Sequence, residues 1–223
     1  MNRSAAEIVR EYGPFPGVDS VHGVTYDGQN VWFATGDTLQ VLDPASGKTT
    51  RSIGVDADAG TAFDGQHLFQ IADGRIQKVD PQTGDVLATI PAPAGSNSGL
   101  AWAEGSLWVG QYRERKIHQV DPQTGAILRT IESNRFVTGV TWVDGELWHG
   151  TWEGDESDLR HVDPHTGEVL EMVEMPEGVM VSGLESDGAD RFFCGGGDSG
   201  KLRAVRRPKS ESDVGETVGT AGV

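Results

Sequence analysis

The sequence has few of the residues that several common classes of site require. Its 223 residues include one cysteine, Cys194, which excludes an internal disulfide and any metal site built from several cysteines. Only 18 basic side chains stand against 34 acidic ones, and the formal net charge of -16 would repel phosphate backbones and anionic lipid surfaces. The composition therefore argues against nucleic acid and membranes as partners.

Long apolar runs are also missing. The first residues have no apolar core of the kind that a signal peptide needs, and no later stretch is long and apolar enough to span a bilayer. We therefore expect a cytoplasmic protein. Residues 207–223 form a polar segment with few large apolar side chains, which predicts a disordered tail. Residues 1–206 are long enough for one domain with a packed core.

Glycine is abundant, and five glycines mark the start of five copies of one repeat unit. An apolar strand begins at each of Gly23, Gly60, Gly99, Gly139 and Gly183, so successive copies are 37, 39, 40 and 44 residues apart. Each strand runs into a tight Asp-Gly or Glu-Gly turn, and a second strand follows at once. In four copies a third strand then ends in an Asp-Pro turn such as residues 121–125, and a fourth strand follows.

This repeat predicts an all-β fold, a five-bladed β-propeller of four-stranded antiparallel blades. The fifth copy lacks a fourth strand, because the chain leaves it through Arg206-Arg207-Pro208. Residues 7–12 near the N-terminus resemble the fourth strands of the other copies. We expect this N-terminal strand to complete blade five and to close the ring, which leaves no exposed edge there.

The connectivity of a propeller predicts where a site would form. The residues just before the innermost strands should meet the ends of the second strands at one mouth of the central channel. The first of these sets is His22, Ala59, Ser98, Thr138 and Ser182. The second set includes Gln111 and Trp152. The Asp-Gly and Asp-Pro turns repeat in the blades at the opposite face, so we interpret their carboxylates as turn caps.

One column of second-strand residues breaks the apolar pattern. Phe33 and Val109 are apolar, as expected of a buried position, but the equivalent residues in the other blades are Gln70, His149 and Cys194. Buried polar groups destabilise a fold unless they find partners. Three such residues at one structural position therefore predict a polar pocket below the channel mouth.

The candidate catalytic residues are His22 and His149, because an imidazole can serve as a general acid or base near neutral pH. The substrate-binding candidates are Gln70, Ser98, Gln111, Thr138, Trp152, Ser182 and Cys194. Trp152 would form an aromatic wall, and the carboxylates in the loop after it could attract a cation or an amine-bearing ligand. The alternatives are hydrogen-bonded packing residues, a solvated acidic loop and, for Cys194, a small buried hydrophobic residue.

Several segments resemble the plant-type glutaminyl-peptide cyclotransferase (glutamine cyclotransferase) family, whose members are five-bladed propellers that cyclise N-terminal glutamine in a pocket on the channel axis. Leu68-Phe69-Gln70 resembles the family's Leu-Tyr-Gln segment, and residues 142–148 resemble its Tyr-Val-Asp-Gly-Glu-Val-Trp segment. Trp152 falls where the family places a pocket tryptophan. The resemblance covers residues 7–206 as architecture and implies the same fold with an axial pocket.

The chain departs from that family at positions that carry the chemistry. His22 stands where the family has a glutamine, and Phe33 where it has the glutamate that handles the proton of the attacking amine. Asp73, Thr138 and Gly196 replace a second pocket tryptophan, an asparagine and a lysine. We therefore do not expect conserved cyclase activity. A further resemblance, to seven-bladed streptogramin-lyase-like propellers, rests only on a shared Asp-Gly-x-Leu-Trp rhythm.

Two functions remain open. The first is an enzyme that processes a small molecule in the axial funnel by proton transfer, such as elimination, cyclisation or lactone opening, with His22 and His149 as acid and base. The second is a non-catalytic propeller that binds a small ligand or scaffolds a protein partner. Metal-assisted hydrolysis ranks below both, because it needs three converging ligands. We expect a monomer without a cofactor or metal, with its small-molecule ligand in the central funnel.

Overall fold

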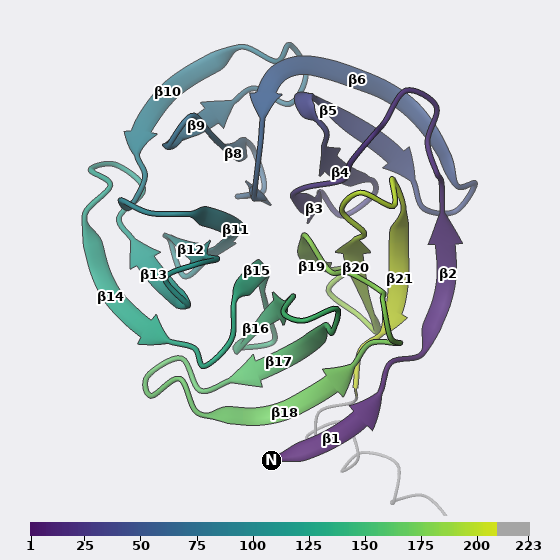
Figure 1. Cartoon of the computed structure of the whole chain (residues 1–223). Coiled ribbons are helices and arrows are strands. Elements are labelled where there is room, and N and C mark those ends of the chain that lie inside the picture. The colour runs from purple at the N-terminus through teal and green to yellow at the C-terminus, as the bar shows by residue number, and fades with distance from the viewer. Residues whose placement is uncertain (209–223) are drawn as a thin grey trace, which may run out of the picture.

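The computed structural model describes residues 1–208, which form strands, turns and loops and contain no helix. The strands make five sheets around one axis (Figure 1). This arrangement confirms the predicted five-bladed propeller. Of the predicted tail, residues 209–223 lie outside the described part of the chain. Within residues 1–208 no helix is long and apolar enough to cross a membrane.

Each blade is numbered by the repeat that forms it. The strands of blade 1 are β3 (Val24–Tyr26), β4 (Val31–Ala34), β5 (Gly36–Asp43) and β6 (Lys48–Ala57). Those of blade 2 are β7 (Thr61–Phe63), β8 (Leu68–Ala72), β9 (Arg75–Val79) and β10 (Val86–Pro91). Those of blade 3 are β11 (Asn97–Ala103), β12 (Ser106–Gln111), β13 (Lys116–Val120) and β14 (Ile127–Glu132).

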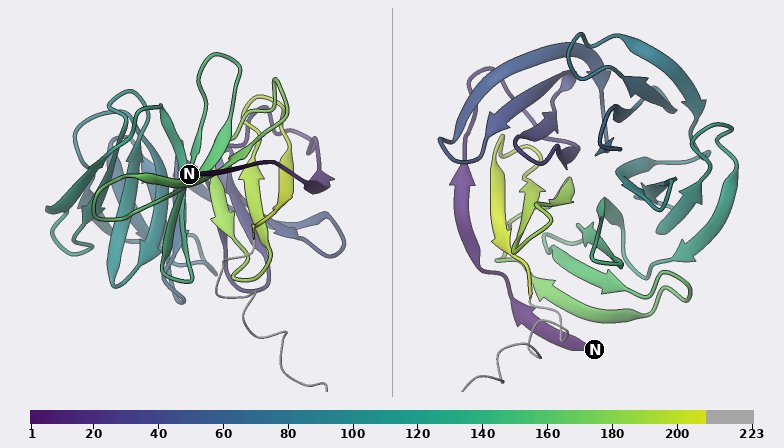
Figure 2. Two further views of the ribbon diagram at one scale, coloured as in Figure 1. Left: turned by 90° about the horizontal axis from the view of Figure 1, so that it is seen from below. Right: turned by 180° about the vertical axis from the view of Figure 1, so that it is seen from behind.

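Blades 4 and 5 share the N-terminal segment. The strands of blade 4 are β15 (Val137–Val143), β16 (Glu146–Thr151), β17 (Asp158–Val162), β18 (Val169–Glu174) and β1 (Asn2–Ala5). The strands of blade 5 are β19 (Leu184–Ser186), β20 (Arg191–Gly195), β21 (Leu202–Arg206) and β2 (Ile8–Tyr12). The innermost strands β3, β7, β11, β15 and β19 surround the axis, as the view from behind shows (Figure 2).

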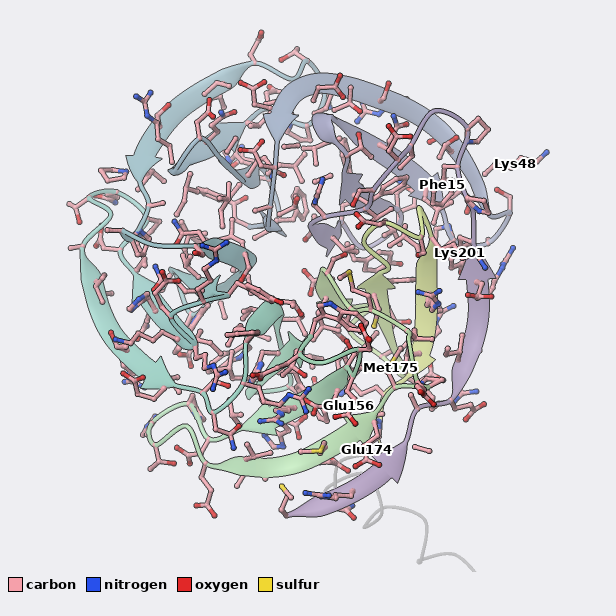
Figure 3. The ribbon with its side chains drawn as sticks, viewed as in Figure 1. Phe15, Lys48, Glu156, Glu174, Met175 and Lys201 are labelled. Carbon is pink, nitrogen blue, oxygen red and sulfur yellow. The ribbon has the colours of Figure 1, made fainter. Side chains whose placement is uncertain are left out.

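The N-terminal strand closes the ring as predicted. β2 pairs antiparallel with β21, with Tyr12 opposite Leu202. The sequence did not predict β1, which adds a fifth strand to blade 4. It runs parallel to β18, with Ala5 opposite Glu174, and Glu174 lies beside it at the end of β18 (Figure 3). The N-terminal segment therefore connects the outer edges of two blades.

The repeating glycines form a tight ring around the axis. A Cβ added to Gly139 would lie 2.2 Å from the backbone nitrogen of Leu184, and one added to Gly183 would lie 2.5 Å from the carbonyl oxygen of His22. The glycines of blades 1, 2 and 3 face the backbone of the next blade in the same way. Five blades enclose a short perimeter, so neighbouring innermost strands approach until no side chain fits between them.

The apolar core lies between the blades. Trp32, Trp108 and Trp148 occupy equivalent second-strand positions and are at most 2% exposed, which confirms their interpretation as core residues. Phe15 lies between blades 5 and 1 (Figure 3). Its ring stacks on that of Phe33, with 4.8 Å between the centroids. Burial of large aromatic rings at each blade contact stabilises the closed ring.

The Asp-Pro turns are capped by their own carboxylates, as predicted. Asp80 Oδ1 accepts hydrogen bonds from the backbone N–H groups of Gln82 and Thr83, at 2.7 and 3.1 Å. These two hydrogen bonds hold the pKa of Asp80 below its ordinary value. The repeated aspartates therefore fix turn geometry.

Arg207, which the sequence places in the tail, packs against the propeller. Its side chain donates hydrogen bonds to Asp144 Oδ2 at 2.5 Å and to Glu146 Oε2 at 3.2 Å. The residue is 5% exposed. It therefore ties the end of the described chain to the first turn of blade 4.

Candidate functional site

A cavity of about 250 Å³ lies at one mouth of the central channel. The residues directly before the five repeating glycines all line it: His22, Ala59, Ser98, Thr138 and Ser182. The other lining residues are Asp58, Asn97, Tyr112, Trp152, Met180 and Val181. The repeat unit thus gathers one position from every blade around a single cavity.

His22 contributes an imidazole ring to this axial cavity. Its backbone N–H is fixed by the carbonyl of Ala34 at 2.9 Å, and its side chain is half-buried. Neither ring nitrogen forms a hydrogen bond with any described residue. Burial lowers the pKa of His22, and the carboxylates of Asp58 and Asp198 oppose that shift. The imidazole is therefore neutral near pH 7 and has a free lone pair.

An aromatic wall of Tyr112 and Trp152 forms another side of the axial cavity. The Tyr112 hydroxyl donates a hydrogen bond to the carbonyl oxygen of Trp152 at 3.1 Å. The Tyr112 ring packs on Phe136 with 4.7 Å between centroids, and the Arg115 guanidinium covers Phe136 at 4.5 Å. This packing holds the wall in place before a ligand arrives.

The three serine and threonine side chains of the axial cavity differ in their hydrogen bonding. Ser98 Oγ donates to the carbonyl of Val137 at 2.7 Å, and Ser182 Oγ donates to that of Val21 at 2.5 Å. Both bonds link neighbouring blades, so these two hydroxyls serve the fold. Thr138 Oγ1 is buried and has no hydrogen-bond partner among the described residues. It leaves one hydrogen bond unformed at the cavity wall.

Gln111 does not line the axial cavity but lies behind it, where it positions Asn97. Asn97 does line the cavity, and it was not predicted from the sequence. Gln111 Nε2 donates to Asn97 Oδ1 at 3.1 Å, and Asn97 Nδ2 donates to the carbonyl of Pro93 at 2.8 Å. Gln111 Oε1 accepts a hydrogen bond from His118 Nε2 at 3.0 Å. His118 is neutral because burial lowers its pKa. The chain of hydrogen bonds fixes the orientation of the Asn97 amide.

Gln70 and Cys194 do not line the axial cavity. Gln70 Oε1 accepts from Thr61 Oγ1 at 2.5 Å, and its Nε2 donates to the carbonyls of Ala59 and Ile71 at 3.1 and 2.9 Å. Its polar atoms are thus satisfied within blade 2. Cys194 is 1% exposed, and burial raises the pKa of its thiol to about 12, so no thiolate forms near neutral pH.

His149 is also placed away from the axial cavity. It is 1% exposed and lines a separate cavity between blades 3 and 4. Burial lowers its pKa to about 4. The structure therefore does not bring His22 and His149 together as an acid and base around one substrate. The reason is geometric, because this position of the second strand faces the neighbouring blade instead of the axis.

Arginines cover much of the acidic loop after Trp152. Arg115 Nη2 lies 2.6 Å from Glu153 Oε1, Arg135 Nη2 donates to the carbonyl of Glu153 at 2.8 Å, and Arg160 Nε lies 2.6 Å from Asp158 Oδ1. Glu156 lies on this loop above blade 4 (Figure 3). Within residues 1–208 no group of three or more His, Cys, Asp and Glu side chains is placed to hold a metal.

The fold is similar to the crystal structure of a glutaminyl cyclase from Myxococcus xanthus. The TM-score is 0.76 at 18% sequence identity, and the match covers 92% of this chain and 97% of that chain. A scan against protein-family models and a search of curated proteins found no match. The likeness shows the five-bladed fold that the sequence resemblance implied. A shared fold does not establish a shared activity, which depends on the side chains of the cavity.

Proposed function

We propose that the axial cavity binds a small molecule that carries an amine beside a planar apolar group, and that His22 accepts a proton from the amine. The observation that carries this proposal is the unpaired, neutral imidazole of His22 in the cavity. A polar side chain at the mouth of a channel with no hydrogen bond to the fold is available for a ligand.

The negative charge near the axial cavity favours a ligand that carries an amine over one that carries a carboxylate. Asp58 lines the axial cavity, and both Asp58 and Asp198 lie close enough to His22 to act on its charge. The aromatic wall of Tyr112 and Trp152 is suited to a cation or to a planar group beside one. With a formal net charge of -16, the chain as a whole attracts cationic molecules.

Transfer of a proton from a bound ammonium group to His22 would leave a nucleophilic amine, the starting point for cyclisation. The similarity to a glutaminyl cyclase supports chemistry of this class. Phe33 is fully buried and stacks on Phe15, so it supplies no carboxyl group to the cavity. The lack of a carboxyl group at this position supports a related proton transfer on a substrate that differs from that of a glutaminyl cyclase.

A binding propeller without catalysis is the second candidate. It is favoured by the isolation of His22, because no described side chain hydrogen bonds to the imidazole and fixes its orientation. Catalytic bases are commonly oriented by such a second group. In this reading the same amine would be bound and released unchanged.

Replacement of His22 by alanine is expected to weaken amine binding. Tryptamine and indole-3-propionate, a matched amine and acid, would be titrated into the wild-type protein, with binding followed by calorimetry. We expect saturable binding of tryptamine alone, and a loss of roughly tenfold or more in the His22→Ala variant, since a hydrogen bond to a charged group is removed.

His165→Ala is the matched control, because His165 is an exposed histidine on an Asp-Pro turn away from the cavity. It should leave the affinity for tryptamine unchanged. Equal binding of the amine and the acid, or no effect of His22→Ala, would contradict the proposal. Turnover of glutaminyl dipeptides and other small amines by the wild-type protein, measured beside the His22 variant, separates the enzyme from the binding propeller.

A further inference from the structure

A second cavity, of about 370 Å³, lies between blades 3 and 4. Ile117 and Ile131 give it an apolar wall on blade 3, and Val162 gives one on blade 4. His149 lines the same cavity from β16. The volume is within the range of small-molecule sites, and the walls are of the apolar kind that such sites have.

His149 brings an unpaired acceptor to this inter-blade cavity. Its Nδ1 lies 3.1 Å from the carbonyl oxygen of Gly150, which can only accept, so Nδ1 carries the proton. Nε2 then has a lone pair, and no described residue donates a hydrogen bond to it. Burial holds the pKa of His149 at about 4, so the ring is neutral at physiological pH.

In the other four blades, the residue at the second-strand position equivalent to His149 serves only the fold. Phe33 and Val109 are apolar and fully buried. Cys194 packs in the core, and Gln70 forms three hydrogen bonds inside its own blade. Among these equivalents His149 alone leaves a strong acceptor without a partner, and it does so beside a cavity.

Glu132 and Asn134, at the edge of the inter-blade cavity, already have partners. Glu132 Oε1 lies 3.5 Å from Lys116 Nζ, and Asn134 Oδ1 accepts a hydrogen bond from Arg160 Nη1 at 2.5 Å. Arg160 is itself paired with Asp158. Among residues 1–208, no free cation at this edge is thus available for an acidic ligand, and the carboxylate of Glu132 at the edge disfavours one.

We propose that the inter-blade cavity is a second ligand site, which takes a neutral planar aromatic molecule with one hydroxyl or N–H donor. The donor bonds His149 Nε2, and the ring packs against Ile117, Ile131 and Val162. This site is independent of the axial cavity, so its test does not depend on the proposed function.

The test uses 2-naphthol and 2-methoxynaphthalene, which share a ring system but differ in the donor. In titrations with wild-type protein we expect saturable binding of 2-naphthol and roughly tenfold weaker binding of 2-methoxynaphthalene, since only the first can donate to Nε2. His149→Phe keeps an aromatic ring and removes the acceptor. It should reduce the affinity for 2-naphthol to the level of 2-methoxynaphthalene, while His22→Ala should leave both affinities unchanged.

A second measurement needs no variant at position 149. In the wild-type protein, addition of 2-naphthol should shift the ¹⁵N resonance of His149 Nε2, as expected when a lone pair accepts a hydrogen bond, and 2-methoxynaphthalene should not. The proposal is overturned if 2-naphthol fails to saturate, if both probes bind equally, or if the Nε2 resonance stays in place. A folded His149→Phe protein with unchanged affinity for 2-naphthol overturns it as well.

Discussion

Replacement of Gly139 by alanine is expected to lower the free energy of unfolding by about 3 kcal/mol or more, because the added methyl group overpacks the ring of innermost strands. The new Cβ would lie 2.2 Å from the backbone nitrogen and 2.6 Å from the Cβ of Leu184. Neither atom belongs to the end of a flexible side chain. Blades 4 and 5 would have to move apart, which opens contacts throughout the closed ring.

Gly54→Ala is the matched control, since Gly54 is an exposed strand residue with no atom within 4 Å of an added Cβ. It should change the free energy of unfolding by less than about 1 kcal/mol. Urea unfolding of the two variants and the wild type measures the difference. For a chain of this size, we expect the melting temperature of Gly139→Ala to fall by roughly 6–12 °C. Equal unfolding midpoints for the two variants would show that the ring tolerates a side chain.

The fold could be predicted because its physical causes repeat. Each blade needs a small residue at the axis, a tight turn and a buried aromatic ring, so the same residue types recur every forty residues or so. The closing strand at residues 7–12 was predictable because one copy lacked a fourth strand. β1 could not be predicted, because it pairs through backbone atoms on the edge of blade 4 and all four of its side chains are exposed.

The candidate site could be predicted only in part. The residues next to the repeating glycines can lie only at the channel mouth, so the repeat was enough to predict their position. A second-strand residue such as His149 is buried wherever it points, because both faces of a blade are covered. Polarity at a buried position therefore indicated an unusual environment but could not distinguish the channel from a blade contact.

Two lining residues of the axial cavity gave no signal that a repeat comparison could detect. Asp58 lies in the variable loop before blade 2, and Asn97 lies next to Ser98 but is fixed by Gln111, a contact between residues 14 positions apart. The position of Asp58 depends on a loop conformation, whereas Asn97 is paired with Gln111 across β11 and β12. The sequence did contain one clear signal that the repeat comparison missed, the carboxyl group of Glu185 in an innermost strand.

Glu185 lies where three blades meet near the axis. Its Oε2 accepts a hydrogen bond from Thr25 Oγ1 of blade 1 at 2.9 Å, and its Oε1 accepts from Thr141 Oγ1 of blade 4 and from the backbone N–H of Ser186 at 2.8 Å. No described basic side chain forms an ion pair with it. Burial raises the pKa of Glu185 to about 7, although these hydrogen bonds oppose the shift.

A carboxyl group with a raised pKa makes the folded protein less stable as the pH rises. Between the ordinary value of 4.5 and about 7, the folded state keeps a proton that the unfolded state has released. The stabilising contribution is complete below pH 4.5 and is lost as the pH passes through 7. At about 1.4 kcal/mol for each pH unit, the loss is at most roughly 3 kcal/mol, and water that reaches the half-buried side chain reduces it.

Glu185→Gln is therefore expected to stabilise the protein at pH 8 by up to about 3 kcal/mol and to leave its stability at pH 4.5 nearly unchanged. The glutamine oxygen can still accept from Thr141 and Ser186, and its amide can donate to Thr25 Oγ1. Urea unfolding at half-unit intervals from pH 4.5 to 8 would measure the difference between variant and wild type, with Gly54→Ala as a control that runs parallel to the wild type. A constant difference across this range would mean that Glu185 is ionised in the folded state at every pH tested, which contradicts the prediction.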